Sequence, residues 1–307
     1  MMVPLLLSIK SNQLEHSIPM SAFYNYLSIS RQGFHKISMV YEDTQSIISE
    51  ISDLVSTYRE KIDCRAGSRS LYYNLNIKEK YDIGVTKFER LMSSHGLTLR
   101  RLSIRIITTK SSLQSWNYSN LADGLSIDNI NQLVVGDLTY IYLAGKRYFL
   151  FCLIDVYSAY IVGFHVSTRM RSIDAQEALN GWIRLRSLGH IIGCIHHTDG
   201  GSQYFSARYM GILNDAEVRI SCARNCLQNG YAEQRNSLIK HHLLPNINMN
   251  ANHPLQAIGR VIRKYNEQRK QKALGWLSPA EFEKQIATMN QRPVHKLFNF
   301  TNAKNGF

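Results

Sequence analysis

Three strand-like segments follow one another in the second half of the chain, and this run constrains the fold more than any other feature. The segments cover residues 132–143, 146–155 and 159–167, and all are rich in Val, Ile, Tyr and Phe. Such residues favour strands, and the short turns between the segments indicate a meander of three strands. A chain with this run must build its core around a β-sheet.

Helices and strands alternate after the run. Residues 172–189 carry apolar side chains on one broad helical face, and the sequence IIGCIHH at 191–197 is again typical of a strand. A helix at 207–216, a short strand at 217–221 and a helix at 228–244 follow. This order predicts an α/β fold, a mixed five-stranded sheet flanked by helices, as in an RNase H-like core.

The first hundred residues are predicted to be helical. Segments 20–27 and 31–38 resemble a helix-turn-helix in which Ser30 caps the second helix, although many small helical hairpins look the same. Further helices are expected at 44–62, which has one apolar face, and at 85–96. We therefore expect an all-α, helix-turn-helix-like region before the sheet, of a kind that contacts DNA.

These patterns divide the chain into five parts. We expect an N-terminal tail at 1–18, the helical DNA-binding region at 19–110, a linker at 111–130, the α/β core with a basic C-terminal helix at 131–290, and a C-terminal tail at 291–307.

Charge and cysteine content limit the classes of partner and compartment. The chain has 36 Lys and Arg against 23 Asp and Glu, a net charge of +13, so a polyanion such as nucleic acid is the expected partner. Its five cysteines form no CxxC pair, which indicates reduced, intracellular use. The early apolar run is too short to span a membrane. We expect a cytoplasmic protein with no membrane partner; the family resemblance described below further implies a bacterial protein associated with the nucleoid.

Three acidic residues occupy positions where a carboxylate needs a cation. Asp137 lies inside the first apolar strand, Asp199 follows the fourth strand, and Glu233 lies early in the last helix. They are 62 (199 minus 137) and 34 (233 minus 199) positions apart, so only folding can bring them together. Divalent cations would relieve their repulsion, and oxygen-only ligation favours Mg²⁺ or Mn²⁺.

Five motifs in order resemble one known family. They are VVGDLTYI around Asp137, LIDVYSAYIVGF at 153–164, HHTDGGSQY around Asp199, NGYAEQRNSLIK around Glu233, and YNEQRKQKALGWLSPAEF at 265–282. Together they resemble the integrase core of DDE transposases, specifically the second-frame (OrfB-type) transposases of the insertion-sequence "IS three" group, which are related to retroviral integrases. Upstream helical segments resemble the same group, so the resemblance covers nearly the whole chain.

The resemblance implies an activity and its residues. Asp137, Asp199 and Glu233 would be the metal-binding catalytic triad, holding two Mg²⁺ (or Mn²⁺) ions for DNA strand cleavage and strand transfer at insertion-sequence ends. The chain departs from the family pattern at Cys222-Ala223 and at Lys270-Gln271, and its spacing from Asp199 to Glu233 is slightly short. No departure removes a carboxylate.

Residues expected to contact DNA come from two sources. Lys240, two helical turns after Glu233 on the same face, and Asn229 and Gln203 match family positions. Basic runs at 99–110 and 260–272 suggest phosphate contacts, although each could also be a solvated charge run. The full expected set is Lys240, Asn229, Gln203, Arg100, Arg101, Arg263, Lys264 and Arg269.

Partners follow from the same resemblance. We expect binding to terminal inverted repeats and target DNA, assembly as a homo-oligomer on paired ends, and an OrfA-type partner from an upstream reading frame if this chain is the second-frame product alone. Two alternatives stay open: a non-catalytic DNA-binding regulator or domesticated relative, and an RNase H-type nuclease that hydrolyses without joining.

Several conspicuous residues have a structural interpretation instead. Asp155 also ends a strand and is expected to act as a structural cap. His196 and His197 are interpreted as polar residues that shape a turn, and Trp182 and Trp276 as core residues.

Overall fold

Two compact units make up the part of the chain that the structure, a computed structural model, describes. The described residues are 19–100, 118–223, 229–246 and 253–296, together with residues 4, 7, 8 and 10. The helical unit consists of Met1–Thr57 and Ile77–Leu97, and the sheet unit of Tyr58–Asn76 and Thr98–Phe307. The five expected boundaries stay a prediction.

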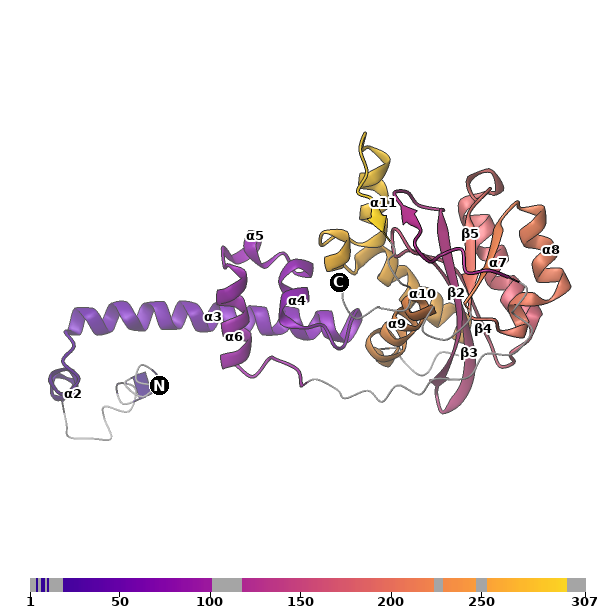
Figure 1. Cartoon of the computed structure of the whole chain (residues 1–307). Helices are drawn as coiled ribbons and strands as arrows, with labels where there is room; N and C mark the ends of the chain where they lie inside the picture. The colour runs from indigo at the N-terminus through magenta and orange to yellow at the C-terminus, as the bar shows by residue number, and fades with distance from the viewer. Residues whose placement is uncertain are drawn as a thin grey trace. The chain divides into compact units, whose positions relative to one another are not determined.

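Helices build the helical unit, as the sequence predicts (Figure 1). They are α2 (Met20–Tyr26), α3 (Arg31–Lys61, which ends in the sheet unit), α5 (Ile77–Tyr81) and α6 (Val85–Ser94). The Ser30 cap is confirmed, because its Oγ accepts a hydrogen bond of 2.9 Å from the Gly33 amide. The expectation of two separate helices at 31–38 and 44–62 was wrong, because α3 spans both segments. The stretch between them holds no Gly or Pro, so the helix continues unbroken.

A mixed five-stranded sheet forms the centre of the sheet unit and confirms the predicted α/β class. Its strands are β2 (Leu133–Leu143), β3 (Lys146–Asp155), β4 (Ile161–Ser167), β5 (Ile195–Thr198) and β6 (Arg219–Cys222), in the order β4-β3-β2-β5-β6. The first three pair antiparallel as a meander, whereas β5 runs parallel to both β2 and β6. A short antiparallel pair, β1 (Ser126–Ile127) with β7 (His295–Lys296), lies outside this sheet.

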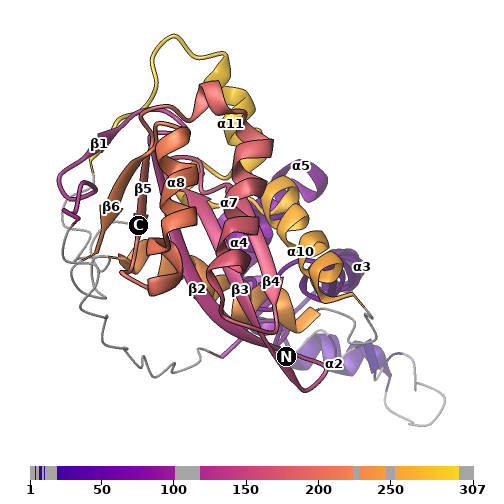
Figure 2. The same cartoon turned by 90° about the vertical axis from the view of Figure 1, so that its right-hand side faces the viewer.

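Helices cover both faces of the sheet (Figure 2). One face carries α7 (Ser172–Arg186) and α8 (Ala207–Asp215), and the other α9 (Gly230–Leu238), α10 (Pro254–Gln268) and α11 (Pro279–Ala287). The short helix α4 (Ser68–Asn74) also belongs to this unit. Among the described residues, no helix is long and apolar enough to cross a membrane.

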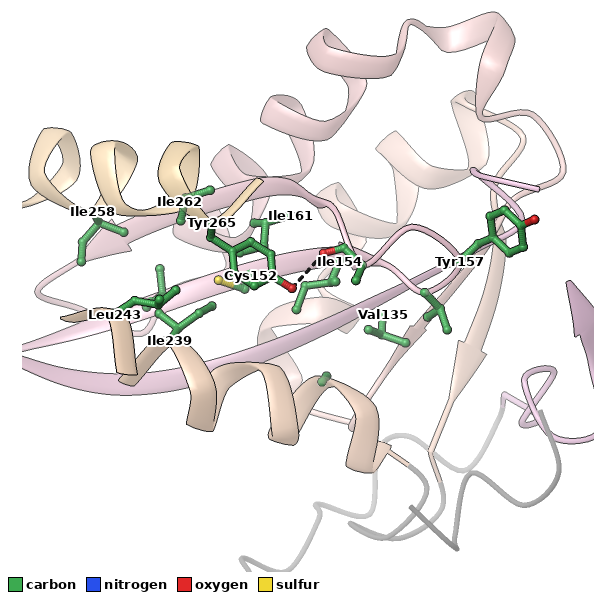
Figure 3. Close-up of a cluster of buried hydrophobic side chains, with 14 of the residues drawn as sticks. Val135, Cys152, Ile154, Tyr157, Ile161, Ile239, Leu243, Ile258, Ile262 and Tyr265 are labelled. Carbon is green, nitrogen blue, oxygen red and sulfur yellow. Dashed lines mark hydrogen bonds between the residues drawn. The ribbon is translucent and has the colours of Figure 1, made fainter. Parts of the chain in front are cut away.

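Burial on both faces explains why the central strands are continuously apolar. On β3, Cys152 and Ile154 face the cluster that includes α9 and α10, whereas Phe151 and Leu153 face α7 and α8. Figure 3 shows the first cluster. The sheet is therefore a rigid platform from which side chains can be presented at strand ends.

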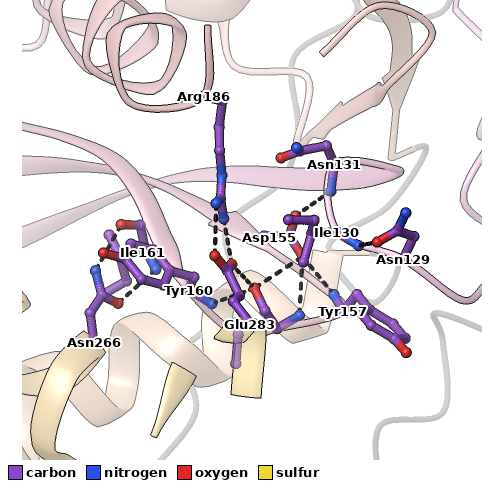
Figure 4. A network of polar contacts seen from close by, with 12 residues as sticks. Asn129, Ile130, Asn131, Asp155, Tyr157, Tyr160, Ile161, Arg186, Asn266 and Glu283 are labelled. Carbon is purple, nitrogen blue, oxygen red and sulfur yellow. Dashed lines mark hydrogen bonds and ion pairs between the residues drawn. The ribbon is translucent and has the colours of Figure 1, made fainter. Parts of the chain in front are cut away.

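A polar network fixes the turn after β3 and confirms that Asp155 is structural (Figure 4). Its carboxylate accepts hydrogen bonds from the amides of Asn131 (2.6 Å), Tyr157 (3.0 Å) and Ser158 (3.1 Å). Burial raises the pKa of Asp155 to about 6, against the lowering effect of these amides. The Ser158 hydroxyl donates to Glu283 on α11, which also pairs with Arg186 on α7.

Close approach of α7 to β4 requires a glycine at position 163. A Cβ built on Gly163 would lie 2.3 Å from the carbonyl oxygen of Ala178 and 3.1 Å from the amide nitrogen of Trp182. Trp182 is fully buried, as expected of a core residue. The helix cannot pack at this distance over any larger residue.

We expect Gly163→Ala to lower the free energy of unfolding by about 2 kcal/mol or more, because backbone must move to relieve the overlap. Urea unfolding measures the effect. The matched control is Gly189→Ala, where a Cβ meets nothing within 4 Å and the change should stay within about 0.5 kcal/mol. Equal effects of the two substitutions would contradict the packing argument.

Candidate functional site

Parallel pairing of β2 and β5 brings two of the three acidic residues to one level of the sheet. The last matched pair of these strands is Val135 with His197. Asp137 lies two residues beyond Val135, and Asp199 lies two residues beyond His197. Neighbouring parallel strands are about 4.8 Å apart, so the two carboxylates are carried side by side at the point where the strands separate.

Helix α9 runs along β2 and carries the third acidic residue. Asn229, its N-cap residue, donates from Nδ2 to the Gly136 carbonyl at 3.3 Å, and Asn236 donates from Nδ2 to Oδ2 of Asp137 at 2.8 Å. Glu233 lies four residues after the first asparagine and three before the second, so all three share one helical face. That face is turned toward Asp137.

The three carboxylates are close enough for charge to act between them. Burial, together with the charges of Asp199 and Glu233, raises the pKa of Asp137 to about 8, although the Asn236 hydrogen bond opposes this rise. Burial raises the pKa of Asp199 too, and burial followed by the charge of Asp199 raises that of Glu233. This is a concentration of negative charge that the described side chains do not neutralise.

The loop after β5 shapes the surroundings of Asp199. Gly200 has a φ of +57°, which favours glycine, and the Gly201 amide donates to Oδ1 of Asp199 at 3.2 Å. A Cβ on Gly201 would lie 2.4 Å from Nε2 of Gln203, so the Gln203 amide packs directly on this glycine. Gln203 therefore lies beside the carboxylates, and its contact with DNA stays a prediction.

Strand β5 is anchored by its two histidines, which have structural contacts as expected but lie within the buried strand and not in a turn. Nδ1 of His196 is 3.2 Å from the Val134 carbonyl oxygen, and Nε2 is 2.8 Å from the Tyr209 hydroxyl. Nδ1 of His197 is 2.8 Å from Oγ of Ser221 on β6. Burial lowers the pKa of His196 to about 4, so its ring is neutral near pH 7.

The donor chemistry of the site fits a hard divalent cation. The three carboxylates, of which Asp199 raises the pKa of the other two, supply oxygen ligands and negative charge, which Mg²⁺ and Mn²⁺ prefer. In the described residues, however, no three His, Cys, Asp or Glu side chains stand in an arrangement that could already hold a metal ion. Asp137 instead accepts the Asn236 hydrogen bond, and Glu233 is exposed on its helix.

Lys240 lies further along β2 on the same side as α9. The helix widens into a π-helical turn at Ile239–Leu243, and the Lys240 ammonium lies 3.8 Å from the centre of the Tyr140 ring. Partial burial lowers the pKa of this lysine. Its contact with DNA stays a prediction, as does that of Asn229, which is only 1% exposed and bonded to Gly136.

The other residues expected to contact DNA are separate from the carboxylates. Arg269 pairs through Nε with Oδ2 of Asp63 at 3.0 Å, and Lys264 donates to the Lys61 carbonyl at 2.8 Å. Arg263 is exposed and lines a groove of about 500 Å³ between β4, α7 and α10, and Arg100 is exposed. Arg101 lies outside the described residues. The roles of these residues stay predictions.

Two residues that matter here escaped the sequence analysis. Asn236 holds Asp137, and its position three residues after Glu233 could have signalled this role. Asp63 is 1% exposed and bonds both Arg269 and Nδ1 of His242, the latter at 2.9 Å. No local pattern marks Asp63, because both partners are far away in the sequence.

Two family models match the part of the chain that carries these residues. Residues 128–226 match the family described as "Integrase core domain", and residues 214–279 match a second family of the same description. Together these matches span all three carboxylates.

Curated relatives are proteins of insertion sequences. "Insertion element IS600 uncharacterized 31 kDa protein" of Shigella sonnei is 34% identical over 52% of this chain and 59% of its own length. "Transposase for insertion sequence element IS629" of Shigella sonnei is 28% identical over 71% of this chain and 73% of its own. "Transposase InsF for insertion sequence IS3fB" of Escherichia coli K12 is 30% identical over 50% and 54%. The chain thus spans little more than half the length of two of these relatives.

Solved structures include a retroviral enzyme. The "HTLV-2 integrase catalytic core domain in complex with magnesium (trimeric form)" is similar with a TM-score of 0.41 and 18% identity, over 53% of this chain and 99% of that one.

The buried His196 makes a pH-dependent prediction. An unfolded histidine has a pKa of about 6.5, so its neutral burial stabilises the fold fully above pH 6.5, and this contribution is lost as the pH falls toward the folded value of about 4. Between pH 7 and pH 4 the wild type should lose on the order of 3 kcal/mol more unfolding free energy than His196→Gln. Urea unfolding at a series of pH values measures the effect. If the unfolding free energies of the two proteins fall by the same amount between pH 7 and pH 4, the prediction is refuted.

Proposed function

We propose that the chain is an insertion-sequence transposase with an integrase core domain, and that it catalyses divalent-metal-dependent cleavage and transfer of DNA strands at the ends of an insertion sequence. One observation carries the proposal. Asp137, Asp199 and Glu233 come from three separate segments, and Asp199 is close enough to the other two that its charge raises the pKa of each. An oxygen-only acidic cluster at a strand end suits phosphoryl transfer.

The three carboxylates would hold the cations. Two bound Mg²⁺ or Mn²⁺ ions would supply charge stabilisation for the attacking and leaving oxygens of an in-line displacement at phosphorus. Asp137 and Asp199 are already side by side, and the exposed Glu233 side chain would have to turn toward them. Ionised carboxylates are the form that binds, so cation binding would displace the proton that the raised pKa of Asp137 favours.

The surrounding residues would position the carboxylates and the DNA. Asn236 orients Asp137, and Asn229 ties the start of α9 to β2, which fixes Glu233 between them. Gly200 and Gly201 leave the loop beside Asp199 without Cβ atoms, so DNA backbone could come close to the site. Water would act first as the nucleophile, and the 3′-hydroxyl it exposes would then attack a second phosphodiester.

The proposed substrates are the terminal inverted repeats of the element and its target DNA. The net charge of +13 supports binding to both. We propose direct DNA contacts for Lys240, Gln203, Arg100, Arg101 and Arg263. Three further residues, Asn229, Lys264 and Arg269, bond to other protein groups and would affect DNA binding through those groups. Joining two ends requires two active sites near each other, so the proposal includes a homo-oligomer on paired ends.

Substitution of one carboxylate tests the proposed function. Asp199→Asn and Glu233→Gln should each reduce Mg²⁺- or Mn²⁺-dependent cleavage and joining of labelled element-end DNA by about 10³-fold or more, because cation binding is lost. Binding to the same DNA, measured by gel shift, should stay within about two-fold of the wild type, since each substitution removes negative charge near phosphate.

Other outcomes point to other classes of protein. Binding of end DNA by the wild type without metal-dependent cleavage would favour the DNA-binding regulator. Cleavage that never yields joined products would favour a nuclease. Equal loss of binding and cleavage in Glu233→Gln would show that this residue has no specific part in the chemistry.

A further inference from the structure

Two exposed tyrosines lie on β2 just beyond the acidic residues. Tyr140 is 52% exposed and Tyr142 is 59% exposed, and their ring centres are 6.2 Å apart in an edge-to-face pair. They share one face of the strand because they are two residues apart. Large aromatic side chains this exposed on a strand beside an active site call for an explanation that core packing does not give.

The charge around the pair is positive. Residues 138–154 contain Lys146 and Arg147 and no acidic residue, and both basic side chains are exposed near the hairpin tip. In the antiparallel register Arg147 is paired with Tyr142, and the Lys240 ammonium lies over the Tyr140 ring from the other side. One cation therefore lies over the Tyr140 ring, and a second is carried opposite Tyr142 on the paired strand, where its guanidinium lies over Phe149.

Position connects the pair with the acidic site. Within the described residues β2 pairs with β5 only over Leu133–Val135, so the edge of β2 from Asp137 onward is open on that side. Figure 1 shows β2 and β3 continuing together as a long hairpin. At about 3.3 Å per residue, Tyr140 lies roughly 10 Å and Tyr142 roughly 17 Å along the strand from Asp137. Alternation along β2 places Asp137 on the opposite face from the two tyrosines, so a strand held at the carboxylates would reach the rings around this edge, where the Lys240 ammonium already meets Tyr140.

We propose that Tyr140 and Tyr142 form a stacking platform for unpaired bases of the DNA strand that leaves the acidic site, with Lys146, Arg147 and Lys240 contacting its phosphates. The proposal rests on the proposed function for its substrate. Exposed aromatic rings flanked by basic side chains are how single-stranded nucleic acid is bound without regard to sequence, because every base has a face that can stack. The basic side chains attract phosphate. They would not attract a protein surface that lacks acidic residues.

A binding assay with single-stranded DNA tests the platform without requiring catalysis. The full chain is titrated onto a fluorescent single-stranded oligonucleotide of about 16 nucleotides in EDTA, at several salt concentrations. The double variant Tyr140→Ala and Tyr142→Ala should bind about 10-fold or more weakly, with the salt dependence unchanged, because stacking and not charge is lost. Lys146→Ala with Arg147→Ala should instead flatten the salt dependence.

Matched variants separate stacking from unfolding. The double Tyr→Phe variant keeps both rings and should bind within about two-fold of the wild type. Ile192→Ala removes a similarly exposed apolar side chain elsewhere on the sheet unit and should leave binding unchanged. Thermal unfolding of the alanine variant confirms that it is folded; if it is not, single Tyr142→Ala, the more exposed position, replaces it.

The results distinguish the platform from the proposed function. Wild-type affinity in the alanine variants overturns the platform, even if the wild type cleaves and joins DNA. Weakened binding in these variants supports it, even if no cleavage occurs, in which case only the proposed chemistry fails. Self-association of the wild type that the alanine substitutions abolish, with DNA binding intact, would assign the tyrosines to a second copy of the chain and overturn the platform.

Discussion

Repulsion between closely spaced, partly buried carboxylates is the constraint on which the rest of the sheet unit depends. Asp137 and Asp199 leave adjacent parallel strands at the same level, and the pKa of Asp137 rises to about 8 as a result of burial and its acidic neighbours. A fold gains no stability from such a cluster. Its presence makes sense where cations and a polyanion complete the charge balance, as in an enzyme that acts on DNA.

The surrounding packing holds that unfavourable cluster in place. A sheet buried on both faces fixes the strand ends, and Asp155 with its three amide hydrogen bonds ties down the turn after β3. Helix α9 is attached to β2 at Asn229 and Asn236, on either side of Glu233. The same helix face ends at Lys240 over Tyr140. One helix therefore aligns the third carboxylate and the proposed DNA surface along a single strand.

Local sequence patterns predicted those features that depend on neighbouring residues in the sequence. Apolar runs gave the strands, and a carboxylate inside such a run at Asp137 stood out because it is costly there. Contacts between distant segments could not be predicted: Asp63 meets Arg269 across 206 positions, and Asn236 meets Asp137 across 99. The continuity of α3 was missed because the residues between its two apolar stretches form helix without marking it. Comparison with relatives shows two integrase core matches and similarity to insertion-sequence proteins, whereas the proposed site is argued from strand register and electrostatics.

Locating bound cations tests the central claim most directly. Crystals of the protein equilibrated with Mn²⁺ would show its position by anomalous scattering. The account predicts Mn²⁺ between Asp137 and Asp199, with Glu233 turned in as a further ligand and the peaks absent from Asp199→Asn. Saturating Mn²⁺ that leaves this cluster empty, or that binds equally well in the Asp199→Asn variant, would contradict it.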